Sequence, residues 1–111
     1  MLQLTAEEQG WLDAYWETLN KKHPGMVQEM LIYGSKARGQ AHAESDVDVI
    51  LIVRNEARAR KRELRRIGYL LAAKTEALPS ILAYTLEEWE SRKRSGSSFR
   101  KAVERDAVRV Y

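Results

Sequence analysis

The sequence predicts a single α/β domain in which helices flank a small β-sheet of about three to four strands. Amphipathic helical patterns alternate along the chain with short apolar runs that are rich in β-branched residues. The length of 111 residues is usual for one domain. With 44% hydrophobic and 32% charged residues, the composition is that of a globular protein and not of a disordered one. We therefore expect residues 1–111 to fold as one domain.

The first expected element is a helix that begins after Thr5. Thr5 and Glu8 have the spacing of a capping box, in which each side chain bonds a free backbone amide at the helix start. The tripeptide 23–25, His-Pro-Gly, predicts the end of this helix. Between these signals, apolar residues recur at helical spacing and form a face that we interpret as core: Trp11, Leu12, Tyr15, Trp16 and Leu19.

Two strands are expected next, with a short polar stretch between them. Residues 26–33 form the first strand, which leads directly into Gly34 and Ser35. Residues 46–53 give the strongest strand signal, because they are rich in β-branched side chains and almost continuously apolar. A strand of this kind is central in its sheet and covered on both faces.

The remaining elements continue the alternation of helix and strand. Residues 56–76 predict a long basic helix, and residues 78–84 predict a third strand. Thr85 caps a further helix, which residues 95–98 separate from a final segment that ends at Tyr111. The long helix carries an apolar stripe that we expect in the core: Leu64, Ile67, Tyr69, Leu70 and Leu71.

The composition excludes several classes of site. The chain has no cysteine, so it has no disulfide, no thiol nucleophile and no thiolate metal ligand. Any metal must be held by oxygen or imidazole ligands. Apolar runs stay shorter than the roughly 18 to 20 residues that cross a bilayer, and residues 1–5 lack the pattern of a signal peptide. We expect a cytoplasmic protein without a membrane segment.

The net charge of +3 is unevenly distributed along the chain. Residues 1–20 contain four acids and no lysine or arginine, whereas residues 54–66 contain seven basic residues and two acids. Residues 92–101 form a second basic stretch without an acid. These stretches are either solvated helix faces or surfaces that attract phosphates or an acidic protein. Nucleic-acid binding, which rests on the basic helix alone, is not favoured.

Two short motifs are candidates for chemistry. Asp46 and Asp48 are two residues apart in the expected second strand, so their carboxylates project from the same face. A hard divalent cation relieves the repulsion between such groups, and Mg²⁺ is the natural candidate for oxygen ligands alone. Gly34 and Ser35 leave the end of the first strand and offer backbone amides, a hydroxyl and a helix N-terminus to an anion.

The spacing of the two motifs predicts that they form one site. Ten residues, 36–45, separate Ser35 from Asp46, and strands flank both motifs. This hairpin context brings a phosphate cradle and a pair of metal ligands together. A phosphate chain would fit between Ser35 and the two aspartates. Arg38 is either a further phosphate contact or a salt bridge that holds the loop.

The two motifs together resemble the signature of the DNA polymerase β-like nucleotidyltransferase superfamily. The resemblance rests on the runs IYGSKARGQA at residues 32–41 and ESDVDVI at residues 44–50. In length, and in the runs YTLEEW at residues 84–89 and VRVY at residues 108–111, the chain is similar to the minimal nucleotidyltransferases, or MNT proteins. The resemblance implies the nucleotidyltransferase fold, with a small mixed sheet flanked by helices.

The same resemblance implies the roles of the motif residues. Asp46 and Asp48 would hold Mg²⁺ in a two-metal site, while Gly34 and Ser35 would bind the β- and γ-phosphates of an NTP. An acceptor hydroxyl then attacks the α-phosphorus, and pyrophosphate leaves. Relatives that modify tRNA, poly(A) or aminoglycosides carry an additional domain for the acceptor, for which a chain of this length leaves no room. MNT proteins are commonly antitoxins encoded beside HEPN proteins, so the resemblance implies transfer of AMP from ATP to a tyrosine of a cognate HEPN ribonuclease toxin.

One position departs from the superfamily pattern. Active members carry a third carboxylate on the following strand, and Ser80 stands about where that carboxylate is expected. A hydroxyl is a poor replacement for a ligand and base, so either a partner or a displaced acid, Glu76 or Glu44, completes the site. The alternative is a catalytically weak module that neutralises a HEPN toxin by binding and masking it.

Overall fold

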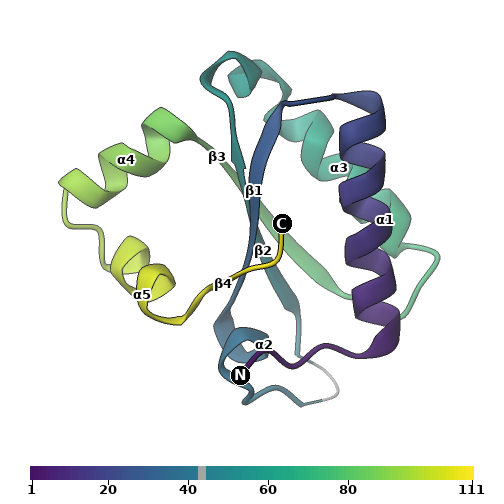
Figure 1. Ribbon diagram of the computed structural model, residues 1–111. Helices are drawn as coiled ribbons and strands as arrows, with labels where there is room; N and C mark the ends of the chain where they lie inside the picture. Colours follow the sequence, from purple (N-terminus) through teal and green to yellow (C-terminus); the bar gives the residue numbers. More distant parts are fainter. Residues whose placement is uncertain (43–44) are drawn as a thin grey trace.

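A four-stranded sheet lies between two layers of helices in the computed structural model, which describes residues 1–42 and 45–111 (Figure 1). The strand order is β3-β2-β1-β4. β2 runs antiparallel to β1 and parallel to β3, and β4 runs antiparallel to β1. The predicted small mixed sheet is therefore confirmed. Its strands are β1 Val27–Tyr33, β2 Val47–Val53, β3 Pro79–Thr85 and β4 Val108–Arg109.

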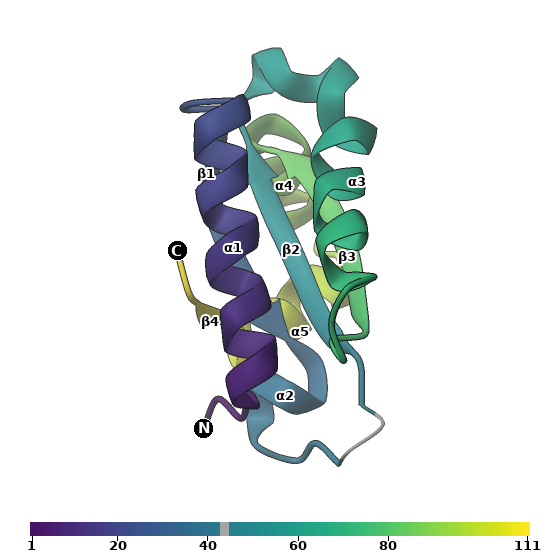
Figure 2. The same ribbon diagram turned by 90° about the vertical axis from the view of Figure 1, so that its right-hand side faces the viewer.

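The helices cover both faces of this sheet. α1 and α3 pack on one face, and α4 and α5 lie on the other (Figure 1), while α2 lies at one end (Figure 2). Every residue of β2 except Asp48 is buried, which confirms the prediction of a central strand covered on both faces. Within the described residues, none of the helices combines the length and apolar character needed to span a bilayer. The helices are α1 Ala6–Lys22, α2 Gly34–Arg38, η1 Asn55–Arg60 (a 3₁₀ helix), α3 Lys61–Ala72, α4 Leu86–Arg94 and α5 Ser98–Asp106.

The capping box at the start of α1 forms as predicted. The Glu8 amide donates to Thr5 Oγ1 at 3.1 Å, and the Thr5 amide donates to Glu8 Oε1 at 2.9 Å. Trp16 is only partly buried, and its ring stacks on Tyr111 with the ring centroids 4.9 Å apart. The other residues of the predicted apolar face are buried in the main core: Trp11, Leu12, Tyr15 and Leu19.

The prediction of one long helix over residues 56–76 is wrong. The segment divides into η1 and α3, and α3 ends at Ala72. Two positions of the predicted apolar stripe are also wrong, because Tyr69 is 44% exposed and Leu70 is 56% exposed. The buried positions of α3 are four residues apart: Leu64, Gly68 and Ala72. This spacing keeps them on one helix face, and Tyr69 and Leu70, which directly follow Gly68, lie off that face.

Gly68 lies at a crowded crossing of α3 with α1. A Cβ at this position would lie 2.6 Å from Ile81 Cδ1 and 2.6 Å from Tyr15 Cζ. We therefore expect Gly68→Ala to lower the free energy of unfolding by about 1–2 kcal/mol, although alanine is the better helix former. Gly10→Ala in α1 is the matched control, because a Cβ there meets nothing within 4 Å. Urea denaturation should show a stability gain of up to about 1 kcal/mol for the control, and equal effects at both glycines would contradict the packing.

Candidate functional site

The two predicted motifs lie at the same end of the sheet. β1 ends at Tyr33, which Gly34 and Ser35 of α2 follow, and Asp46 directly precedes β2. Because β1 and β2 are antiparallel, the end of one strand lies beside the start of the other, and Tyr33 is the register partner of Asp48. α2 and the start of β2 lie together at this end in Figure 2. The hairpin context expected from the spacing thus brings Gly34 next to Asp48.

Gly34 makes the close approach between the two motifs possible. Its φ of +73° lies in the left-handed region, which favours glycine. A Cβ at this position would also overlap with Oδ2 of Asp48. Any other residue would therefore push the start of α2 away from the carboxylate. The backbone at this point requires glycine for both reasons.

The carboxylates of Asp46 and Asp48 interact with each other. Burial raises the pKa of Asp48, the charge of Asp46 raises it further, and the charge of Arg38 lowers it. Burial followed by the charge of Asp48 also raises the pKa of Tyr33 to about 12. None of the ion pairs in the described part of the chain involves either aspartate. The pair is a concentration of negative charge that a cation would stabilise.

This donor set fits Mg²⁺. Over residues 1–42 and 45–111, no three or more histidine, aspartate or glutamate side chains group to hold a metal ion. Two carboxylates suffice for Mg²⁺, which usually takes one or two from a protein and completes its shell with water and substrate phosphates. Glu76, one of the two acids considered as a replacement for the third carboxylate, does not join Asp46 and Asp48. Glu44, the other candidate, lies outside the described residues.

Ser80 lies beside Asp48 on the neighbouring strand. The parallel pairing of β2 and β3 makes these two residues register partners. The position of β3 next to Asp48 therefore carries a hydroxyl and not a carboxylate. β3 is the edge strand on this side of the sheet, so no further strand of the described chain lies beyond Ser80.

Arg38 forms a contact between α2 and α5. Its Nη1 lies 3.8 Å from Oδ2 of Asp106, and its Nε donates to Oε1 of Gln40 at 3.1 Å. Of the two roles expected for this residue, the structure supports the salt bridge that holds the loop. The guanidinium is exposed, and its charge lowers the pKa of Asp48. Arg38 therefore interacts electrostatically with the site. Contact with a phosphate stays a prediction.

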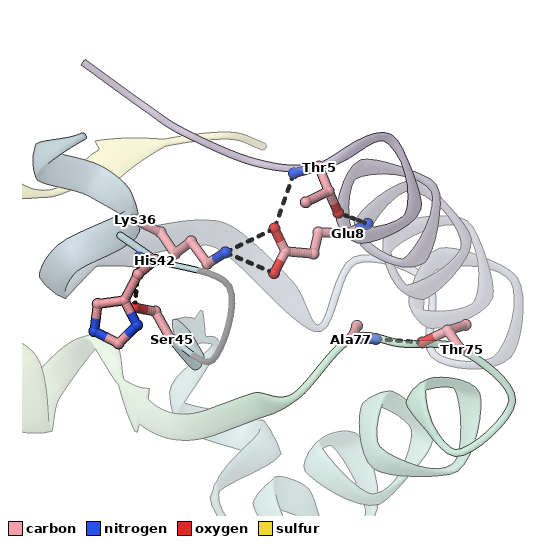
Figure 3. Close-up of polar contacts among 7 residues, drawn as sticks. All are labelled: Thr5, Glu8, Lys36, His42, Ser45, Thr75 and Ala77. Atoms are coloured by element: carbon pink, nitrogen blue, oxygen red, sulfur yellow. Dashed lines mark hydrogen bonds and ion pairs between the residues drawn. The ribbon is translucent and has the colours of Figure 1, made fainter. Parts of the chain in front are cut away.

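Lys36 had no predicted role, yet it ties the Gly34-Ser35 turn to α1. It is buried, and its Nζ lies 2.9 Å from Oε2 and 3.0 Å from Oε1 of Glu8, as Figure 3 shows. The same Glu8 completes the capping box with Thr5. One carboxylate therefore joins the start of α1 to the middle of α2. No sequence signal identifies this pair, because its members are 28 positions apart.

A mostly apolar hollow of about 250 Å³ opens beside Gly34. Tyr33, Gly34 and Arg38 line one side of it, and residues of α5 that include Phe99 and Asp106 line the other. The rings of Tyr33 and Phe99 meet edge to face with their centroids 5.5 Å apart. The hollow thus places aromatic surface next to the Gly34-Ser35 turn, where a planar group could bind.

The sheet order, the short helix that starts with Gly34-Ser35 and the Asp-x-Asp pair at the start of β2 define a domain of the nucleotidyltransferase class. A family model described as nucleotidyltransferase domain matches residues 12–107. The chain therefore belongs to this nucleotidyltransferase family, whose members generally use an NTP and a divalent metal. No curated protein matches the chain in sequence.

Solved structures resemble the fold at low sequence identity. A candidate nucleotidyltransferase from Sulfolobus solfataricus is 18% identical with a TM-score of 0.56, and the match covers 92% of this chain and 78% of the other. A mutant of the toxin-antitoxin MntA-HpeT is 17% identical with a TM-score of 0.53 and coverage of 89% and 71%. A toxin-antitoxin with AMP-PNP is 18% identical with a TM-score of 0.53 and coverage of 89% and 72%. These likenesses show a shared fold.

Proposed function

We propose that the chain is a Mg²⁺-dependent nucleotidyltransferase that acts as an antitoxin by transferring AMP from ATP to a tyrosine of a cognate HEPN ribonuclease toxin. The observation that carries this proposal is the placement of Gly34 beside an aspartate pair without cationic partners among the described residues. Family membership supports the transferase chemistry. The two toxin-antitoxin neighbours, one with AMP-PNP, support a toxin partner and an adenine nucleotide.

Each residue of the site has a defined part in this reaction. Asp46 and Asp48 would hold Mg²⁺, which when bound supplies charge neutralisation at the phosphates. Gly34 and Ser35 would hold the β- and γ-phosphates through backbone amides and the hydroxyl. The tyrosine oxygen forms a bond to the α-phosphorus while the bond from that phosphorus to the pyrophosphate oxygen breaks. The hydroxyl proton passes to water and pyrophosphate leaves. Positioning and charge neutralisation supply most of the catalysis.

Label transfer to a purified partner tests this proposal. The chain is incubated with Mg²⁺, ATP labelled at the α-phosphate and the HEPN protein encoded beside it. We expect label on the HEPN protein, loss of label when EDTA is added, and loss when the acceptor tyrosine is replaced by phenylalanine. Absence of label, under conditions in which an active relative labels its own partner, would overturn the proposal.

A second function is favoured by one observation, the hydroxyl of Ser80 in register with Asp48. With only two carboxylates the chain would hold its toxin in an inactive complex and turn over little ATP. The variant Ser80→Asp distinguishes an enzyme from a masking protein, because it adds a carboxylate at that position. If the chain is an enzyme limited by this gap, transfer should rise by about tenfold or more. A pure masking protein should stay inactive with either residue at position 80, which the label-transfer assay measures.

A further inference from the structure

Three arginines of α3 form a cationic surface. Arg62, Arg65 and Arg66 take part in none of the ion pairs of the described chain, unlike Arg60, which lies 3.7 Å from Glu63. The Nε atom of Arg65 is buried and lacks a hydrogen-bond partner in the described structure. The exposed guanidinium groups of Arg62 and Arg66 are free to bind an incoming anionic group.

Exposed apolar side chains continue this surface toward the end of α3. Tyr69 and Leu70 stand three to five positions beyond the last two arginines and therefore share their side of the helix. Together the five residues line a hollow of about 740 Å³, and we call them the arginine face: Arg62, Arg65, Arg66, Tyr69 and Leu70. Exposed apolar side chains next to arginines are typical of a protein-binding surface.

The apolar end of the arginine face borders the candidate site. The Tyr69 hydroxyl accepts a hydrogen bond of 2.9 Å from the amide of Ile81. Ile81 directly follows Ser80, which is the register partner of Asp48. β3 is an edge strand, so this side of the site has no further strand beyond it in the described chain. A protein bound to the arginine face would therefore lie next to the open side of the aspartate pair.

We propose that the arginine face is the docking surface for the protein substrate, and that this partner presents acidic side chains around an exposed apolar residue. The inference rests on the proposed function for the role of the partner and adds where and by what chemistry it binds. Arginine forms bidentate pairs with carboxylates, and Tyr69 and Leu70 offer the apolar contact. Glu63 lies in the same hollow but is paired with Arg60 at 3.7 Å, and the exposed Leu70 gives this face an apolar contact that favours a protein over a phosphate backbone.

Binding of a defined peptide tests the surface without ATP or transfer. The probe is a fluorescent 12-residue peptide in which aspartates and glutamates surround one tryptophan, with an asparagine-glutamine version as its neutral counterpart. We expect the acidic peptide to bind, and Arg62→Glu combined with Arg66→Glu to weaken binding at least tenfold. The matched control is Arg94→Glu combined with Lys101→Glu on α4 and α5, which changes the net charge equally on exposed residues of the other sheet face. The control should change affinity less than about twofold.

Several results would overturn the inference. These are no binding of the acidic peptide, equal weakening by both double variants, equal binding of the neutral peptide, or tighter binding of a uridine 12-mer than of the peptide at the same salt. Self-association that Arg62→Glu and Arg66→Glu abolish would also overturn it, because the occupant would then be a second copy of the chain. Since the peptide assay needs no nucleotide, label transfer can fail while docking holds, and docking can fail while label transfer holds. Thermal unfolding checks that both double variants fold.

Discussion

Replacing Asp48 with asparagine is expected to lower nucleotidyl transfer about a thousandfold while the fold stays intact. Asparagine has nearly the same size but lacks the charge that would hold Mg²⁺ beside the phosphates. Metal-ion stabilisation of a phosphoryl transition state is worth several kcal/mol, and about 1.4 kcal/mol corresponds to a tenfold change in rate. The label-transfer assay measures the effect. The same variant tested in cells separates enzyme from masking protein, because a masking antitoxin should still neutralise its toxin.

The same substitution should also stabilise the fold in Mg²⁺-free buffer at neutral pH. Folding raises the pKa of Asp48 above its ordinary value of 3.8, so the ionised carboxylate favours the unfolded chain. Well below pH 3.8 both states keep the proton and the effect vanishes. As the pH rises through the folded pKa the destabilisation develops, and it persists at neutral pH. Chemical denaturation should therefore show an advantage of Asp48→Asn over the wild type that grows with pH. An advantage that is larger at pH 3.5 than at pH 7 would contradict this assignment.

Replacing Lys36 with methionine is expected to lower the free energy of unfolding by about 3–5 kcal/mol, because it leaves the Glu8 carboxylate buried without a cation. The side chains of this pair are 5% and 9% exposed, so water cannot replace the lost partner. For a domain whose total stability is about 5–15 kcal/mol, the loss is large. The double variant Glu8→Gln with Lys36→Met should recover most of it, since no uncompensated charge remains. Urea unfolding of all four proteins gives the coupling energy.

A second capping box supplies the control for this experiment. Glu88 bonds Thr85 at the start of α4, and Lys61 lies 2.9 Å from its carboxylate. The geometry matches that of Thr5, Glu8 and Lys36, but Lys61 and Glu88 are 25% and 31% exposed. Lys61→Met should therefore cost only about 1 kcal/mol or less. A loss as large as that of Lys36→Met would show that burial is not the cause of the difference.

Local signals in the sequence predicted those parts of the fold that depend on neighbouring residues. Thr5 and Thr85 predicted the starts of α1 and α4, because a helix N-cap is recognised from residues only three positions apart. The run at residues 47–53 predicted the central strand because burial on both faces leaves a continuous apolar pattern. The proximity of Gly34 to Asp48 also followed from local spacing, since a hairpin brings its own ends together.

Features that depend on distant residues were not predictable in this way. The stripe of α3 was misassigned at Tyr69 and Leu70 because periodicity alone does not say which helix face meets α1. The Lys36 and Glu8 pair joins segments that only the folded chain brings together. β4 has two residues and pairs with Leu31 and Ile32 of β1, a contact that no local pattern of its own identifies.

The outer side of β3 is closed to a further strand although it is the edge of the sheet. Val47 donates to the Leu78 carbonyl, so alternate positions from 79 to 85 turn away from β2. Pro79 has no amide hydrogen, the Ile81 amide is bonded to the Tyr69 hydroxyl, and the Thr85 amide is bonded to Glu88. Most of the backbone amides that could pair with an added strand are thus missing or already hydrogen-bonded, which protects this edge from aggregation. Any protein that approaches the site from this side has to be recognised through side chains and not through backbone pairing.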